Sequence, residues 1–262
     1  MTSSTSFETR HEGSGPGGAP SLSLVVPAYD EEESLPHLYD RVCEVFGRDL
    51  SWELIIVDDG SRDGTAKVIG ELELKDPRVR AVSLKRNCGQ TTAIATGFGL
   101  ARAPLIATLD ADLQNDPGDL PALISALGKN DAVVGYRVKR EDDFIRIASS
   151  RIANGVRNRL SGDQIRDTGC SLKLFRSEAI RSIPLFEGMH RFLPTLLRFH
   201  GYSVIEHPVS HRPRIAGVSK YGIRNRAWRA FKDLLAVRWM RSRVIPHDIV
   251  ARRAPAPRQE EG

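Results

Sequence analysis

The chain has 262 residues, of which 40% are hydrophobic and 27% are charged, enough for one substantial core or for a core with a small appendage. Its three cysteines lack the spacing of metal ligands, so we expect a reducing compartment and thiol-independent chemistry. The formal net charge is +5, but residues 222–243 hold seven Arg or Lys against Asp233 alone. The rest of the chain is therefore close to neutral, which argues against general nucleic-acid binding and favours one anionic surface or ligand.

Strands and helices alternate along the first half of the chain. Apolar, β-branched runs predict strands at 21–28, 52–57, 79–84, 105–109 and 131–136, and helical patterns separate them at 35–46, 65–75, 91–101 and 120–127. This alternation predicts an α/β fold with a Rossmann-like, mostly parallel sheet flanked by helices. Later segments predict a short helix at 190–200, a last strand at 202–208 and a helix at 223–245.

The segment LIATLDADLQNDP, residues 105–117, ends a predicted buried strand in two carboxylates, Asp110 and Asp112. Residues two apart on a strand point the same way, so we expect both carboxylates on one side of its carboxyl end. Two like charges so close favour a hard divalent cation such as Mg2+ or Mn2+ between them, with Gln114 adding a carbonyl oxygen or orienting the waters of the ion. The alternative is that both are solvated loop residues and that Asp116 or Asp119 caps the next helix.

Carboxylates also follow the first two strands, at Asp30 and Glu31 and at Asp58 and Asp59. In a parallel sheet, ligands bind outside the carboxyl ends of the strands, where these residues would meet the D-x-D pair. Ribose hydroxyls and base N–H groups are donors to carboxylates, and phosphates need a metal near such acids. A nucleotide therefore suits this edge, although G-x-G-x-x-G and Walker loops are absent.

Two later segments carry candidate polar residues. Arg146 and Ser150 are one helical turn apart, which suits a phosphate, although any single arginine there is more often a solvated surface residue. Asp167 precedes Thr168 and Gly169, the pattern of a turn, and a general base beside a phosphate would look the same in sequence.

Six motifs occur in the order found in family 2 glycosyltransferases. They are VVPAYDEEESL at 25–35, IIVDDGSRDGT at 55–65, KRNCGQTTAIATGF at 85–98, LDADLQNDP at 109–117, DTGCSLKLFR at 167–176 and GVSKYG at 217–222. Over residues 21–240 the chain resembles the polyprenyl-phosphate type, which includes dolichol-phosphate mannose synthases and undecaprenyl-phosphate glycosyltransferases. The resemblance implies a GT-A fold and inverting, metal-dependent transfer of a sugar from a UDP- or GDP-sugar to a polyprenyl phosphate.

The resemblance also implies roles for individual residues. The nucleotide-sugar would be bound by Pro27, Tyr29, Glu31, Asp58, Asp59 and Asp110, and the metal by Asp110, Asp112 and Gln114. The acceptor phosphate would be bound by Arg137, Arg146, Ser150, Arg214, Ser219 and Lys220. Asp112, Asp167 and Arg146 would be the catalytic residues; a lipid phosphate is already ionised near neutral pH, which weakens the case for Asp167 as a base. Asp30 and Cys88 depart from the residues usual in the family, an asparagine and an aromatic, at positions that are not catalytic.

Residues 223–245 combine apolar and basic side chains. Six apolar residues fall near one side of the predicted helix, Trp228, Phe231, Leu234, Leu235, Trp239 and Met240. With a lipid acceptor implied, we expect an amphipathic helix on an anionic membrane surface rather than a terminal helix packed on the domain.

The expected organisation is a disordered tail at 1–20, a catalytic domain at 21–215, an acceptor loop with the membrane-surface helix at 216–246 and a flexible tail at 247–262. No apolar run reaches the length of a transmembrane helix, and residues 1–20 do not form a secretion signal. We therefore expect peripheral attachment to the cytoplasmic face of the membrane, either directly or through a partner, which would be a membrane-anchoring protein or a second copy of this chain. No nucleic-acid partner is expected.

Two other functions compete with this prediction. A family 2 enzyme acting on a saccharide or other soluble acceptor would share the donor loops, but it would not need the set formed by Arg146, Arg214, Ser219 and Lys220. A non-catalytic nucleotide-sugar-binding subunit would not need an intact D-x-D motif with Gln114.

Overall fold

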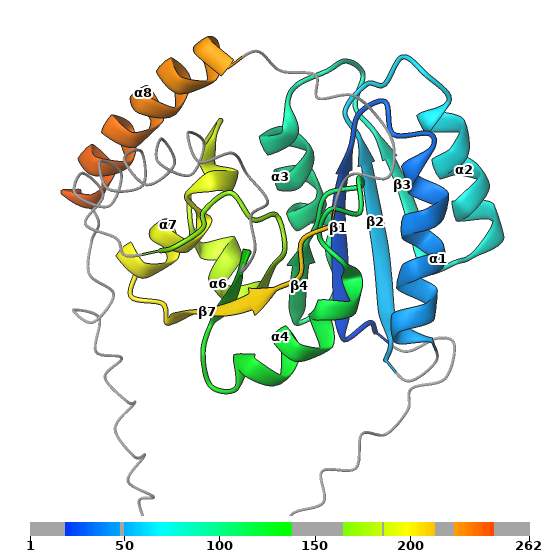
Figure 1. Ribbon diagram of the computed structural model, residues 1–262, viewed down its shortest axis with the longest axis horizontal. Helices are drawn as coiled ribbons and strands as arrows, with labels where there is room; N and C mark the ends of the chain where they lie inside the picture. The colour runs from blue at the N-terminus through cyan, green and yellow to red at the C-terminus, as the bar shows by residue number, and fades with distance from the viewer. Residues whose placement is uncertain (1–18, 48–49, 138–164, 185, 213–222, 244–262) are drawn as a thin grey trace, which may run out of the picture.

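The computed structural model describes residues 19–47, 50–137, 165–184, 186–212 and 223–243. Its centre is a seven-stranded sheet in the order β3-β2-β1-β4-β6-β5-β7 (Figure 1). The strands are β1 (Leu22–Ala28), β2 (Trp52–Asp58), β3 (Val79–Ser83), β4 (Leu105–Thr108), β5 (Ala132–Arg137), β6 (Lys173–Arg176) and β7 (Val204–Val209).

The predicted parallel sheet is confirmed for most strand pairs. β1 pairs in parallel with β2 and β4, β2 with β3, and β5 with β7. The exception is β6, which the sequence did not predict and which lies antiparallel between β4 and β5. The sheet is therefore mixed. β6, which follows Asp167 in the sequence, lies in the interior of the sheet.

Helices cover both faces of the sheet. They are α1 (Ser34–Phe46), α2 (Thr65–Lys75), α3 (Gln90–Leu100), α4 (Leu120–Leu127), α6 (Ser177–Ser182), α7 (Leu193–Phe199) and α8 (Ile223–Arg241), with short 3-10 turns η1 (Pro117–Asp119) and η2 (Met189–Arg191). In Figure 1, α1 and α2 lie to the right of the sheet, while α3, α7 and α8 lie to its left.

Alternation along the strands explains why the core has two halves. Successive side chains of a strand point to opposite faces. In β2, Leu54 and Ile56 join the hydrophobic cluster under α1, α2 and α4, whereas Ile55 and Val57 join the cluster under α3, α6 and α7. A strand that is apolar at every position is thus buried on both sides, as expected for the middle of a covered parallel sheet.

The structure divides the apolar face predicted for the C-terminal helix. Leu234 and Val237 of α8 are buried in the cluster that also holds α7, and Met240 packs against it. Leu235 and Trp239 are exposed, Trp239 by 63%. The prediction of one apolar side was therefore wrong for this part of the helix, because Leu234, Val237 and Met240, each three residues apart, pack on the domain while Leu235 and Trp239 face outward. Among the described residues, no helix combines the length and apolar character needed to cross a bilayer.

A buried carboxylate joins three strands at the amino edge of the sheet. Glu53 is only 2% exposed, and its Oε1 accepts hydrogen bonds from Ser23 Oγ at 2.6 Å and from the Arg102 N–H at 2.7 Å. Its Oε2 accepts from Arg102 Nε at 3.0 Å and from Arg80 Nη1 at 3.1 Å. The carboxylate of Glu53 thus has a hydrogen-bond donor on each oxygen. Removing its charge leaves the guanidinium groups of Arg80 and Arg102 without their counter-charge.

Replacing Glu53 by Gln is expected to lower the free energy of unfolding by about 3 kcal/mol at pH 7, because two guanidinium groups lose their counter-charge. Urea denaturation followed by circular dichroism measures this difference. Glu71→Gln serves as the control: Glu71 pairs with Lys67 at 3.8 Å on the exposed face of α2, where such pairs contribute little. Equal effects of the two substitutions would contradict a structural role for Glu53.

The same difference should depend on pH. Burial by itself raises the pKa of Glu53, but the hydrogen bonds from Ser23, Arg102 and Arg80 outweigh it and leave the pKa below its usual value. A lowered pKa contributes stability above the unfolded-state value of about 4.3, and this contribution is lost as the pH falls through the folded value. The gap between wild type and Glu53→Gln should therefore be full at pH 7 and shrink below about pH 4. A gap that widens on acidification would contradict this sign.

Candidate functional site

The carboxyl ends of β1 and β2 bring the predicted nucleoside-binding residues together. Ala28 and Asp58 are register partners at the ends of these strands, so the loops that follow them lie side by side. The Asp30 N–H donates to Ser61 Oγ at 2.9 Å, and the Glu31 N–H donates to Thr65 Oγ1 at 2.7 Å. The two loops therefore form one hydrogen-bonded unit above the sheet.

The two adjacent aspartates after β2 have different surroundings. Asp58 Oδ1 accepts from both the N–H and the hydroxyl of Ser61, so this carboxylate orders its own loop. Asp59 accepts from the N–H groups of Cys88 at 2.7 Å and Gly89 at 2.8 Å, ahead of α3. Burial raises the pKa of Asp59, and the charge of Asp58 adds to this, against the two N–H donors that lower it.

Gly60 lets the loops after β2 and β3 meet. Its φ is +70°, a backbone conformation that is unfavourable for residues with a side chain. A Cβ at this position would lie 2.5 Å from the carbonyl carbon of Arg86. Glycine is thus required for the close approach that places Asp59 beside Cys88 and Gly89.

The D-x-D motif lies in the loop after β4 rather than on the strand itself. β4 ends at Thr108, two residues before Asp110, and Leu113 has a positive φ of 57° that turns the chain sharply. Asp112 is buried, and its Oδ1 accepts from the Gln114 N–H at 3.1 Å. Asp110 accepts from Gln90 Nε2 at 2.9 Å. The strand is therefore shorter than predicted, and the turn at Leu113 orients the second carboxylate.

The surroundings of Asp110 fit a hard divalent cation. Burial raises the pKa of Asp110 to about 6, and the charge of Asp112 adds to the shift, so the two carboxylates lie within electrostatic reach of one another. A cation relieves this cost. The nearby His211 has a buried Nδ1 without a hydrogen-bond partner in the described part of the chain. Burial and the charge of Arg137 lower the pKa of His211, against smaller raising effects of the Gln114 backbone and Asp112. Among the described residues, no three His, Cys, Asp or Glu side chains group as a metal site.

A cavity of about 210 Å³ opens beside Asp110. Lys173 of β6 is only 4% exposed, lines this cavity and donates from Nζ to the Cys170 carbonyl. Burial lowers the pKa of Lys173, while Cys170 and Asp110 act to raise it. The other polar residues of the lining are Gln90, Thr108, Thr168, Ser171, His190 and Arg191, and Pro27, predicted to contact the nucleotide-sugar, lines it too. A cavity of this composition suits a ligand with many hydroxyl groups or negative charge.

Arg137 and Asp167 form a bidentate ion pair at the carboxyl end of β5. Arg137 Nε lies 2.7 Å from Asp167 Oδ2, and its Nη2 lies 3.0 Å from Oδ1. Asp167 also accepts from the Gly169 N–H at 3.1 Å, the turn interaction that its position predicted. Both carboxylate oxygens of Asp167 thus bind the guanidinium of Arg137. This pairing favours a role for Asp167 in orienting Arg137 over the expected role as a base.

The described part of the site contains residues that sequence reasoning missed. Lys173 could have been noticed as a lysine inside an apolar strand, and Gln90 as a polar residue between Gly89 and a helix, whereas nothing local marks His211. Five predicted residues lie outside the described residues, namely Arg146, Ser150, Arg214, Ser219 and Lys220, as do the tails at 1–18 and 247–262.

The chain has relatives of known family among curated proteins. Residues 23–183 match the model of glycosyl transferase family 2. The chain is 42% identical over 236 residues to a dodecaprenyl-phosphate galacturonate synthase from Rhizobium johnstonii, covering 86% of this chain and 69% of that protein. It is 39% identical over 207 residues to an undecaprenyl-phosphate 4-deoxy-4-formamido-L-arabinose transferase from Edwardsiella ictaluri, covering 77% of this chain and 63% of that protein.

Solved structures share the fold at lower identity. A glucosyl-3-phosphoglycerate synthase from Mycobacterium tuberculosis, in complex with Mg2+ and uridine diphosphate, superposes with a TM-score of 0.63 at 16% identity over 87% of this chain and 81% of that one. A mannosyltransferase from Pyrobaculum calidifontis, in complex with GDP-Man and Mn2+, gives 0.58 at 22% identity over 86% and 65%. These likenesses confirm the predicted GT-A fold. Since the family match spans β1 to α6 and the sequence relatives extend it at 39–42% identity, the chain belongs to glycosyl transferase family 2.

Proposed function

We propose that the protein transfers one sugar, with inversion, from a UDP- or GDP-sugar to the phosphate of a polyprenyl lipid at the cytoplasmic face of the membrane. The observation that carries the proposal is the meeting of Asp59, Asp110 and Asp112 with the cations Lys173 and Arg137 around one edge of the sheet. Carboxylates suit a nucleoside and a metal, and the cations suit phosphate oxygens. Two relatives whose names give a polyprenyl phosphate as acceptor support the choice of lipid.

The donor half of the site follows from the loops after β1, β2 and β4. Tyr29, Glu31 and Asp59 would hold the nucleoside, and Asp58 would keep its loop in place through Ser61. Asp110, Asp112 and Gln114 would hold Mg2+ or Mn2+. When bound, the metal neutralises charge on the departing nucleoside diphosphate. The cavity beside Asp110 would receive the sugar, with Lys173 at its wall.

The acceptor half of the site positions a second anion beside the first. Arg137 would bind the lipid phosphate, together with Arg146, Ser150, Arg214, Ser219 and Lys220. The lipid phosphate is a nucleophile that is already ionised near neutral pH, so holding it against repulsion from the donor diphosphate is the main task. Asp167 would orient Arg137 through its bidentate contact.

Sugar transfer tests the proposal directly. Purified protein with Mn2+ is offered a panel of UDP- and GDP-sugars, with undecaprenyl phosphate in detergent or with soluble saccharides as acceptors. The proposal predicts a glycolipid product from at least one donor. Transfer to a saccharide alone would favour the alternative family 2 function, and binding without turnover would favour a non-catalytic subunit.

Peripheral attachment through α8 is the second part of the proposal. Leu235 and Trp239 are exposed, and Arg238, Arg241 and Arg243 on the same stretch are exposed as well. Exposed apolar side chains beside basic residues suit the surface of an anionic bilayer. A membrane-anchoring partner or self-association would provide attachment if this surface does not.

Trp239→Glu is expected to weaken sedimentation with phosphatidylglycerol vesicles about tenfold, because an inserted indole is replaced by a charge that the anionic surface repels. Leu74→Glu is the matched control, since Leu74 is 90% exposed on α2 and far from α8 in the fold (Figure 1). Equal binding of the two variants would show that Trp239 does not contact the bilayer.

A further inference from the structure

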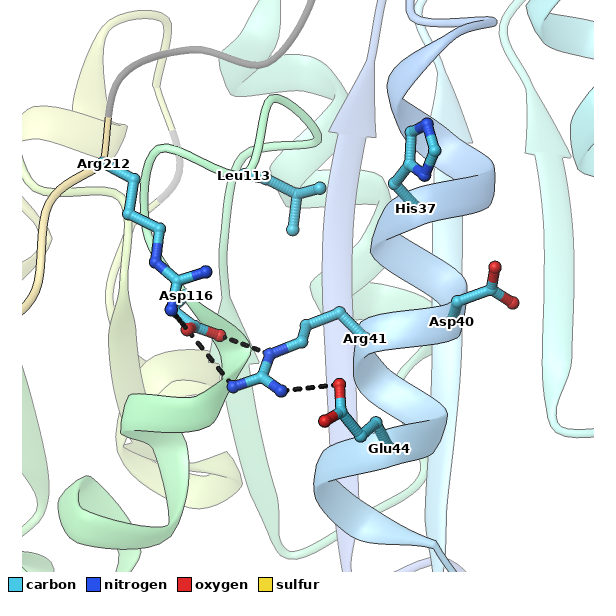
Figure 2. Close-up of a pocket in the computed structure, with 7 residues that line it drawn as sticks. All are labelled: His37, Asp40, Arg41, Glu44, Leu113, Asp116 and Arg212. Atoms are coloured by element: carbon cyan, nitrogen blue, oxygen red, sulfur yellow. Dashed lines mark hydrogen bonds and ion pairs between the residues drawn. The ribbon is translucent and has the colours of Figure 1, made fainter.

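Asp116, four residues after Asp112, connects three separate parts of the fold (Figure 2). Its Oδ1 lies 2.9 Å from Arg41 Nε on α1, and its Oδ2 lies 2.6 Å from Arg212 Nη2, three residues beyond β7. Oδ1 also accepts from the Gly118 N–H at 2.8 Å and so caps η1. We call Arg41, Asp116 and Arg212 the Asp116 clasp.

More than this ion pair binds the chain after β7 to the loop that carries Asp110, Asp112 and Gln114, which we call the metal loop. The Arg212 N–H donates to the Gln114 carbonyl at 2.9 Å. Ser210 donates to Asp119 Oδ2 from its N–H at 2.8 Å and from its hydroxyl at 2.6 Å. Residues 210–212 are thus joined to residues 114–119 at three points, and Arg214 follows two residues later in the sequence.

The metal loop needs such support. Leu113 stands between Asp112 and Gln114 with a φ of 57°, a left-handed conformation that is unfavourable for leucine. Strained residues of this kind persist only where their surroundings fix them. Leu113 is buried in the cluster with α1, and the clasp ties the following residues to the same helix through Arg41.

Each oxygen of Asp116 already faces a guanidinium, which distinguishes the clasp from an open ligand site. Arg41 Nη1 also contacts Glu44 at 2.6 Å, and the adjoining hollow of about 300 Å³ is lined by His37 and Asp40 as well. Burial raises the pKa of Asp116, but the hydrogen bonds from Arg41 and Gly118 and the charge of Arg212 hold it below its usual value. The carboxylate therefore stays charged and paired at neutral pH.

We propose that Asp116 is a positioning residue that couples the two halves of the site. Through the clasp it fixes the loop carrying Asp112 and Gln114, and it anchors residues 210–212, which precede Arg214 in the sequence. The expected effect on acceptor affinity rests on the proposed function. The expected effect on metal affinity concerns binding alone and does not depend on sugar transfer. Metal affinity and acceptor affinity are thereby controlled by one carboxylate that contacts neither ligand.

The test uses Asp116→Asn, Arg212→Gln and their combination in the full chain. Glu44→Gln is the matched control, because it touches Arg41 without touching the loop. Mn2+ affinity in the presence of UDP or GDP is measured by calorimetry, the KM for undecaprenyl phosphate by transfer, and Tm by circular dichroism. Asp116→Asn and Arg212→Gln should each weaken Mn2+ binding about tenfold and raise the acceptor KM, as expected for groups that orient a ligand of a metal. The double variant should lose little more than Asp116→Asn, while nucleotide affinity without metal and the behaviour of Glu44→Gln stay as in wild type.

A lower Tm with unchanged Mn2+ affinity and acceptor KM would overturn the inference, because a merely structural role moves only Tm. If Asp116→Asn does not fold, Arg212→Gln and Arg212→Lys decide alone, since the Arg212 side chain is 58% exposed and Arg41 Nη2 still donates to Asp116 Oδ2 at 3.3 Å after its loss. A wild-type protein that binds Mn2+ but transfers no sugar would refute the proposed function, and the Mn2+ measurements would still decide for or against the clasp.

Discussion

Replacing Asp112 by Ala is expected to reduce sugar transfer by at least about a thousandfold, because charge neutralisation at the leaving diphosphate supplies several kcal/mol of the barrier reduction. Asp112 is buried, and its Oδ1 accepts from the Gln114 N–H, which lies within its own loop. The substitution should therefore leave the fold intact while it removes a metal ligand and releases Gln114. The initial rate of glycolipid formation measures the effect.

Asp40→Asn is the control for Asp112→Ala, since Asp40 is exposed on α1 and should tolerate the change with near wild-type activity. Calorimetric titration with Mn2+ in the presence of nucleotide should show the loss of binding in Asp112→Ala alone. Full transfer by Asp112→Ala with unchanged dependence on Mn2+ would place the metal elsewhere.

Replacing Arg137 by Gln is expected to lower kcat/KM for the lipid acceptor about a hundredfold, equal to about 3 kcal/mol for charge-assisted hydrogen bonds to a phosphate. The loss should appear in the acceptor KM, and nucleotide affinity should not change. The geometry makes a further prediction about Asp167, whose two oxygens hold the Arg137 guanidinium at 2.7 and 3.0 Å.

If Asp167 orients Arg137, then Asp167→Asn in the Arg137→Gln background should cost little beyond the first substitution, because the partner is already gone. A general base would behave differently: its removal would cost a further factor of about a hundred or more and would alter the pH profile of kcat. Transfer rates of the two single variants and the double variant, measured between pH 6 and 9, separate these roles. Additive losses would contradict the positioning role.

The sequence could predict the parallel strands because they are apolar and alternate regularly with helices. β6 escaped prediction because Lys173 and Arg176 interrupt its apolar run and no helical pattern separates it from a preceding strand. Its partners β4 and β5 come from distant parts of the chain, so its place between them is decided by tertiary contacts.

In the candidate site too, residues within local sequence patterns were predictable, whereas those brought in by tertiary contacts were not. Asp59, Asp110 and Asp112 were predictable, since each stands directly after a recognisable strand or within a motif. Lys173 and His211 belong to the site only because the fold brings Asp110 and Asp112 to them. The role of Asp116 was predicted only as a helix cap, which the structure confirms for η1, and its two arginines come from segments 75 and 96 residues away. Pairings over such separations leave no local signal.

The most direct measurement follows radiolabelled sugar from its nucleotide into the organic phase in the presence of undecaprenyl phosphate and Mn2+. We expect label to enter the lipid fraction with at least one UDP- or GDP-sugar, to require both the lipid phosphate and the metal, and to vanish with Asp112→Ala. Label that stays in the aqueous phase with every donor, while the same protein binds nucleotide and Mn2+, would contradict the proposal that this protein glycosylates a polyprenyl phosphate.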